Sequence, residues 1–190
     1  MSEAHGETVT EVITSESLSE RIGALADAVN KDYQGRTPIL VSVLKGTLPF
    51  IADLGRRLTI PVEFDFLQLT RFGEGGRIGI ALDTGDSLTH RDVILVEDIV
   101  DTGLSLQTLH QILAERHVSS LSTVTLLDKV PRRLVDVPLE YRGFEVGDEY
   151  LVGYGLDWQG KFRNLPGIWA ILDRPAFERD LTGQFAYMYG

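Results

Sequence analysis

The alternation of apolar and polar positions divides the chain into helical segments separated by short apolar runs. Apolar residues recur every three or four positions over residues 15–33, 47–58 and 106–116, which predicts three amphipathic helices. Ser17 is followed by Glu20 three residues later, a pattern that predicts an N-cap for the first helix. Pro49 stands in the first turn of the second helix, where its missing N–H does no harm.

Short runs rich in Val, Ile and Leu predict the strands. They cover residues 39–44, 62–69, 78–82, 93–100, 122–127, 150–156 and 168–172. Strands that alternate with helices predict an α/β fold with a mostly parallel central sheet flanked by helices. The chain contains no linker, internal repeat or low-complexity segment, so we expect one domain over residues 1–190. A ligand of such a fold binds beyond the carboxyl ends of the strands.

One segment, residues 93–106, combines a buried strand with unusual chemistry. Glu97 and Asp98 stand near the end of the strand, a turn with Asp101 and Gly103 follows, and a helix begins soon after. Such a turn directs backbone N–H groups and the helix dipole at one point, which suits a phosphate. The hydroxyls of Thr102 and Ser105 add uncharged donors, and Gly103 allows the backbone to come close to the phosphate.

The acidic residues of this segment would repel an anion unless they face a ribose or a divalent cation. A sugar phosphate with Mg²⁺ satisfies all of these groups together. The simpler alternative is a strand followed by a helix that Asp101 caps. Three carboxylates within five residues exceed what one helix end requires, so the sequence favours a sugar-phosphate site.

Composition limits the other function classes. The 190 residues include no cysteine, which excludes disulfides and thiolate chemistry and fits a cytoplasmic chain. No apolar run approaches the roughly 20 residues of a membrane helix, and polar residues 1–11 resemble neither a signal nor a transit peptide. A net charge of −10 argues against a general nucleic-acid surface. We therefore expect neither a membrane nor a nucleic-acid partner.

Other strand ends also carry polar residues. Lys45 and Gly46 follow one strand, Lys129 follows another, and Asp157 and Arg163 follow the run at 150–156. Taken alone, each of these residues is as compatible with a solvated turn or a surface ion pair as with a ligand site. Together with the acids after residue 96, they are predicted to meet at one edge of the sheet. The histidines show no metal-ligand spacing and are interpreted as surface residues; they are His5, His90, His110 and His117.

With these residues in place, the chain resembles the type I phosphoribosyltransferases, and among them the hypoxanthine(-guanine) phosphoribosyltransferases. The segment 96–103, Val-Glu-Asp-Ile-Val-Asp-Thr-Gly, resembles the family's motif for phosphoribosyl diphosphate (PRPP). Further matches lie at residues 43–46, 126–129, 152–157 and 162–166, and their order and spacing agree from about residue 15 to 172. The resemblance implies the family's fold, including a small hood region.

The resemblance further implies Mg²⁺-dependent transfer of a 5-phosphoribosyl group from PRPP to N9 of hypoxanthine, or of guanine, with release of pyrophosphate. Glu97 and Asp98 would bind the ribose hydroxyls, directly or through Mg²⁺, and Asp101 would be the general acid/base near purine N7. The implied 5′-phosphate loop consists of Asp101, Thr102, Gly103, Leu104 and Ser105.

The remaining implied roles concern the base and the leaving group. Lys129 would donate to the exocyclic O6, Tyr150 would stack on the base, and the backbone near Leu151 would contact the purine edge. Asp157 would hold a Mg²⁺ that also binds pyrophosphate, and pyrophosphate would be bound by Lys45, Gly46 and Arg163. The family also implies a homo-oligomer, a dimer or a tetramer.

One feature departs from the family pattern. The mobile loop of the family usually carries a Ser-Tyr pair, whereas residues 70–76 contain Arg71 and Phe72 at the nearest positions. This difference leaves open a phosphoribosyltransferase for another base, such as xanthine or a non-purine. A regulator that senses PRPP or a nucleotide is a further alternative, which the complete set of site residues disfavours.

Overall fold

The computed structural model describes residues 7–72 and 77–190, and its backbone divides into two compact units. The larger unit is Ile22–Gly147, and the smaller combines the described residues up to Arg21 with Asp148–Gly190. The boundary falls within helix α2 (Ser15–Asp32). The expectation of a single domain over residues 1–190 remains a prediction.

The larger unit contains a six-stranded sheet with the strand order β4-β3-β2-β5-β6-β7. Neighbouring strands pair in parallel except β3 and β4, which pair antiparallel. The prediction of a mostly parallel central sheet is therefore confirmed. The strands are β2 (Ile39–Val43), β3 (Glu63–Phe72), β4 (Arg77–Leu82), β5 (Asp92–Val100), β6 (Ser120–Asp128) and β7 (Tyr141–Glu145).

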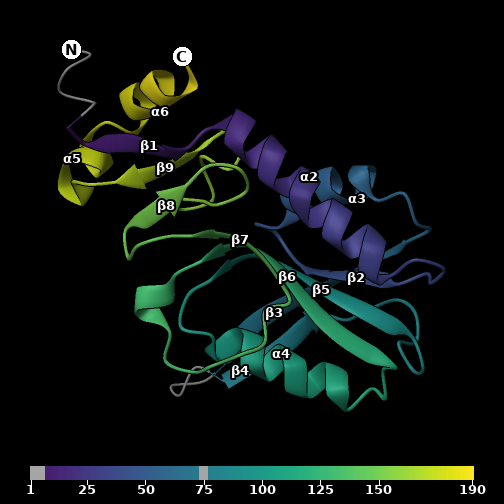
Figure 1. Ribbon diagram of the computed structural model, residues 1–190. Helices are drawn as coiled ribbons and strands as arrows, with labels where there is room; N and C mark the ends of the chain where they lie inside the picture. The colour runs from purple at the N-terminus through teal and green to yellow at the C-terminus, as the bar shows by residue number, and fades with distance from the viewer. Residues whose placement is uncertain (1–6, 73–76) are drawn as a thin grey trace. The chain divides into compact units, whose positions relative to one another are not determined.

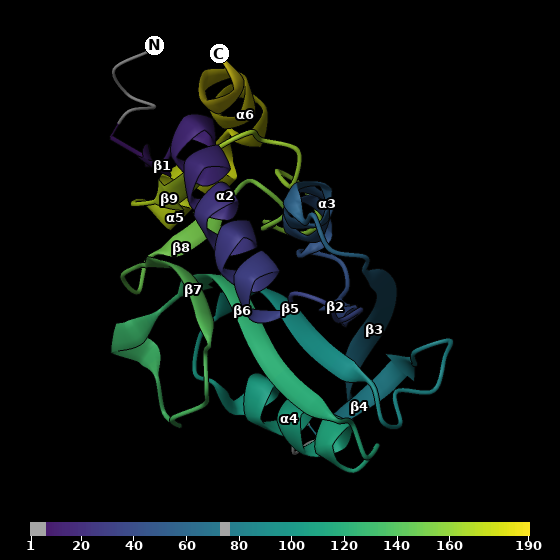
Figure 2. The same cartoon turned by 45° about the vertical axis from the view of Figure 1, so that its right-hand side comes forward.

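Helices cover both faces of this sheet, because its central strands are apolar on both sides. Helices α3 (Leu48–Arg57) and α4 (Leu104–Ala114) lie on opposite faces (Figures 1 and 2). Alternate residues of β2 and β5, such as Val41 and Leu95, pack in one core cluster with Leu109 and Leu113 of α4. Their neighbours Leu40 and Ile94 are also fully buried, as is usual for parallel strands.

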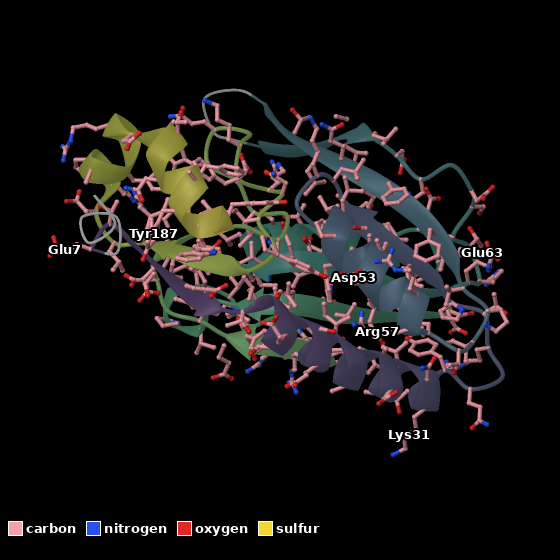
Figure 3. The ribbon with its side chains drawn as sticks, turned by 90° about the horizontal axis from the view of Figure 1, so that it is seen from above. Glu7, Lys31, Asp53, Arg57, Glu63 and Tyr187 are labelled. Atoms are coloured by element: carbon pink, nitrogen blue, oxygen red, sulfur yellow. The ribbon has the colours of Figure 1, made fainter. Side chains whose placement is uncertain are left out.

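The helix ends show one incorrect prediction. Thr14, and not Ser17, caps α2, because Thr14 Oγ1 accepts a hydrogen bond from the backbone N–H of Ser17. The helix itself begins at Ser15, as predicted, so only the capping residue differs. Figure 3 labels Lys31 in the last turn of α2, where a cation interacts favourably with the helix dipole.

The smaller unit contains its own antiparallel sheet with the strand order β1-β9-β8. Its elements are β1 (Val9–Ile13), β8 (Tyr150–Val152), β9 (Ile168–Ile171), α5 (Arg174–Arg179) and α6 (Leu181–Tyr189) (Figure 1). Val9 of β1, Ile171 of β9, Phe177 of α5 and Met188 of α6 share one buried cluster. The sequence pattern did not indicate β1, β7, α5 or α6.

This arrangement corrects the prediction that Asp157 and Arg163 share a sheet edge with the other candidate residues. Their neighbouring strands belong to the antiparallel sheet and not to the six-stranded one. Strand β8 is also shorter than predicted, because Gly153, Tyr154 and Gly155 have φ values of 98°, 46° and 99°. Three successive positive φ angles are incompatible with extended backbone, so the strand ends at Val152.

Candidate active site

The turn between β5 and α4 has the geometry expected of an anion site. Helix α4 begins at Leu104, two residues earlier than predicted, so Ser105 lies in its first turn. Gly103 is its N-terminal flanking residue and forms no side-chain cap. The Leu104 N–H makes only a long hydrogen bond of 3.4 Å to Thr102 Oγ1, and the helix dipole adds partial positive charge at the same end.

Gly103 is required at this turn for two reasons. Its φ of 83° is rarely adopted by other residues. In addition, a Cβ atom at this position would lie 3.0 Å from the Val135 carbonyl oxygen and 3.1 Å from an Arg133 guanidinium nitrogen. The turn thus packs closely against the chain that follows β6.

A cavity of about 470 Å³ opens at the end of β5 and beside this turn. Its volume falls in the range of small-molecule sites. It brings together five predicted residues, with Val43, Leu69, Ile99, Val100 and Leu106 as apolar neighbours. The five are Glu97, Asp101, Thr102, Gly103 and Ser105.

Two adjacent carboxylates stand at the end of β5. Burial raises the pKa of the Glu97 carboxyl well above its usual range, and the neighbouring charge of Asp98 raises it further. Asp98 Oδ1 accepts a hydrogen bond from the backbone N–H of Ile99 at 2.8 Å. An acidic pair with an unfavourable charge of this kind is stabilised when a cation binds.

Lys129 lies at the end of the neighbouring strand, as predicted, and is largely buried. Its backbone N–H donates to the carbonyl of Val100 at 2.9 Å, which ties the end of β6 to the end of β5. The lysine is thereby held at the same sheet edge as the acidic pair. Lys45 is exposed in the turn after β2, and the buried Gly46 follows it.

Arg132 and Arg133, which follow Lys129, were not selected as site residues from the sequence. Arg132 Nε donates to Asp101 Oδ1 at 2.5 Å. Arg133 Nε donates to Asp128 Oδ1 at 2.7 Å. Their position after a core strand adjacent to the phosphate turn was the available signal. The alternative in which Asp101 caps α4 is also not realised, since its carboxylate binds Arg132 instead.

The other candidate residues lie in the smaller unit. The Tyr150 hydroxyl donates to the Asp157 carbonyl at 2.9 Å, and its ring packs edge-on against Trp158. Desolvation raises the pKa of Tyr150, with a further contribution from the Asp157 charge. Leu151 is buried beside it.

Both carboxylate oxygens of Asp157 have partners within that unit. Oδ1 lies 2.6 Å from Arg163 Nη2, and Oδ2 accepts from the Gly160 N–H at 2.7 Å. Arg163 also donates to the carbonyl of Gly155. The candidate metal ligand and the candidate pyrophosphate ligand are therefore bound to each other here.

The described residues contain no group of three or more His, Asp or Glu side chains placed to hold a metal ion. Within the same residues, no helix is long and apolar enough to cross a membrane. His110 is half-buried, contrary to the surface assignment, and its Nε2 lies 2.7 Å from Thr123 Oγ1. His90 and His117 are exposed, as expected, and His5 lies outside the described residues.

Part of the predicted mobile loop cannot be compared with the family pattern. Thr70, Arg71 and Phe72 form the end of β3, which pairs with β4. Residues 73–76 and the side chains of Arg71 and Phe72 lie outside the described part of the chain.

Comparison with known proteins identifies the class to which this fold and site belong. Residues 9–159 match the phosphoribosyl transferase domain family. A hypoxanthine-guanine phosphoribosyltransferase of Staphylococcus aureus is 37% identical over 168 residues, which cover 86% of this chain and 94% of the relative. The chain belongs to the phosphoribosyltransferase family and, within it, to the hypoxanthine-guanine phosphoribosyltransferases.

Two further comparisons agree with this membership. A hypoxanthine-guanine phosphoribosyltransferase structure from Bacillus anthracis has a TM-score of 0.83 and 37% identity, covering 86% of this chain and 98% of that one. The bifunctional protein TilS/HprT of Listeria monocytogenes is 39% identical over 86% of this chain, which spans only 26% of that protein's length.

Proposed function

We propose that this protein catalyses the transfer of the 5-phosphoribosyl group from PRPP to N9 of hypoxanthine or guanine, in purine salvage. The products would be IMP or GMP and pyrophosphate. The observation that carries the proposal is the joint placement of a phosphate turn, an acidic pair and a buried lysine at one edge of the parallel sheet.

The phosphate turn supplies neutral donors to the 5′-phosphate. This turn consists of residues 101–105. Leu104 and Ser105 are the first residues of α4 and offer their N–H groups, and Thr102 and Ser105 offer their hydroxyls. Backbone donors and a helix dipole bind a phosphate dianion without a neighbouring lysine. Lys45 and Gly46 are proposed to contact the pyrophosphate group of PRPP.

The acidic pair fits a magnesium ion. Mg²⁺ is usually bound by one or two carboxylates together with substrate phosphates and water, so a complete protein cage is not expected. Glu97 and Asp98 would hold it, because they are adjacent, partly buried carboxylates and Glu97 lines the cavity. When bound, the ion would coordinate the neutral ribose hydroxyls and offset the negative charge of the departing pyrophosphate.

Asp101 and Lys129 are proposed to act on the base. As N9 forms its bond to C1′ and pyrophosphate leaves with the bonding electrons, the Asp101 carboxylate receives the proton from N7. The Lys129 ammonium donates to O6 and thereby selects 6-oxopurines. The roles implied for Tyr150, Leu151, Asp157 and Arg163, and also a homo-oligomeric state and a cytoplasmic location, remain predictions.

A panel of bases tests the proposal. Purified protein is incubated with PRPP and Mg²⁺ and with hypoxanthine, guanine, xanthine, adenine or uracil, and pyrophosphate release is measured. The expected result is rapid release with hypoxanthine or guanine. Release with xanthine or uracil alone would show that the enzyme uses a different base from the one proposed. No release with any base would contradict an enzymatic role.

A further inference from the structure

We propose that Arg132 is a positioning residue that fixes the Asp101 carboxylate for proton transfer. This inference rests on the proposed function, because the role of Asp101 belongs to that proposal. Arg132 Nε donates to Asp101 Oδ1 at 2.5 Å, while Oδ2 has no partner among the described residues. The arginine thus occupies one carboxylate oxygen and leaves the other to receive the purine proton.

The pair is too exposed to act mainly on stability. The side chains of Arg132 and Asp101 retain 45% and 47% of their accessible surface, and ion pairs of that kind contribute little to folding. The same exposure makes the ion pair important for the orientation of Asp101, because a half-exposed aspartate without a partner samples several rotamers. A charge-assisted hydrogen bond to a planar guanidinium restricts the carboxylate to one of them.

Arg132 can act in this way because the segment that carries it, residues 129–135, is tightly bound to the phosphate turn. The backbone N–H groups of Leu134 and Val135 both donate to the carbonyl of Thr102, at 3.0 and 3.3 Å. The next residue, Arg133, is bound to the buried Asp128 carboxylate at 2.7 Å. The guanidinium of Arg132 therefore extends from a fixed backbone.

The same short turn also carries Lys129. Arg132 belongs to the 3₁₀ turn η1 (Val130–Arg132), and its N–H donates to the Lys129 carbonyl at 2.9 Å. The O6 and N7 atoms are neighbours on the edge of a 6-oxopurine. One turn would therefore supply both the donor to O6 and the residue that orients the acceptor of the N7 proton.

A double-mutant cycle separates orientation from a general structural effect. Arg132→Gln removes the guanidinium and Asp101→Asn removes the acceptor. We expect Arg132→Gln to lower kcat for hypoxanthine about tenfold and Asp101→Asn to lower it by about 100-fold or more. The KM for PRPP should change by less than about twofold in Arg132→Gln, because the backbone amides that bind the phosphate are untouched.

The decisive result is the double variant. If Arg132 acts through Asp101, then the double variant should have the kcat of Asp101→Asn alone, within about twofold. Arg132→Lys keeps the positive charge but not the planar guanidinium, so its kcat should lie between those of Arg132→Gln and the wild type. Arg91→Gln is the matched control, because Arg91 pairs with Glu63 at 2.6 Å with similar exposure and neither residue lines the cavity.

Three outcomes are informative. Non-additive losses with wild-type kcat in Arg91→Gln support the inference. Wild-type kcat in Arg132→Gln, or losses that multiply in the double variant, overturn it while the wild-type enzyme remains active on hypoxanthine. A wild-type protein with no turnover overturns the proposed function itself, so the two failures are distinguishable. Urea midpoints of all variants identify any loss of folding.

Discussion

Arg133 and Asp128 form an ion pair in which the carboxylate is almost completely buried. Arg133 Nε lies 2.7 Å from Asp128 Oδ1, and the Asp128 side chain retains 2% of its accessible surface. Arg142 Nε lies 3.1 Å from the other oxygen. The pair fixes the backbone between the end of β6 and the phosphate turn.

Asp128→Ala should therefore destabilise the protein. It leaves Arg133, which is itself mostly buried, without its carboxylate, and removing one partner of a buried pair costs about 3 kcal/mol of unfolding free energy. Urea unfolding followed by circular dichroism measures the change. Glu63→Ala, which breaks the exposed pair with Arg91, is the control and should change the free energy by less than about 1 kcal/mol. Equal effects of the two substitutions would contradict this account.

Gly103→Ala should reduce both stability and turnover. The methyl group would meet the Val135 carbonyl at 3.0 Å in addition to the cost of a positive φ. Gly35→Ala is a suitable control, since Gly35 has a φ of 78° and no atom within 4 Å of the added carbon. We expect Gly35→Ala to cost about 1 kcal/mol and Gly103→Ala at least about 2 kcal/mol, with a turnover loss of about tenfold or more. Wild-type turnover in Gly103→Ala would show that the close approach is unimportant.

Lys129 should make the enzyme reject adenine. An ammonium can donate to a 6-oxo group but cannot accept from a 6-amino group, and an unpaired buried donor costs roughly 1–3 kcal/mol, which disfavours adenine about tenfold or more. A reaction that contains both adenine and hypoxanthine measures this preference directly. Lys129→Ala should weaken hypoxanthine use with little change in the KM for PRPP, whereas Lys31→Ala, at the end of α2, should behave as wild type. Equal conversion of adenine and hypoxanthine would contradict the role of Lys129 in selecting 6-oxopurines.

Activity should depend on a divalent cation. Glu97 and Asp98 place two adjacent carboxylates where an anionic substrate is proposed to bind, and a divalent cation would remove their repulsion of that substrate. Chelation of Mg²⁺ should abolish turnover, and excess Mg²⁺ should restore it. Full turnover under chelation would exclude a metal from the reaction.

Stability should fall between pH 7.5 and 5.5 because of His110. Burial lowers the pKa of this imidazole below 6.5, with the opposing charge of Glu140 as the smaller effect. At pH 7.5 the group is almost entirely neutral in both states, so the fold keeps nearly its full stability. Below pH 6.5 the unfolded chain binds the proton more readily, so stability decreases as the pH falls.

His110→Gln should reduce this dependence on pH, as measured by the urea midpoint at the two pH values. His117→Gln is the control, because His117 is exposed and should leave the dependence unchanged. An identical loss of stability in wild type and His110→Gln would assign the pH effect to other groups.

The sequence by itself determined the elements that propensity and hydrophobic period control. Val93, Ile94 and Leu95 are apolar in succession, which favours a strand buried on both faces, and β5 is that strand. The phosphate turn was also readable, because Asp101, Thr102 and Gly103 act through local backbone geometry. Local features of this kind do not depend on what packs against them.

Only the tertiary structure decided which strands pair and which charges meet. Residues 150–152 and 168–171 have the same apolar character as β5, yet they join β1 in a separate antiparallel sheet, because strand pairing depends on partners distant in the sequence. Likewise, the sequence shows that Arg132 follows a core strand but does not show which carboxylate it meets. Its contact with Asp101 bridges 31 residues, and such a contact exists only because β5 and β6 are neighbours in the folded sheet.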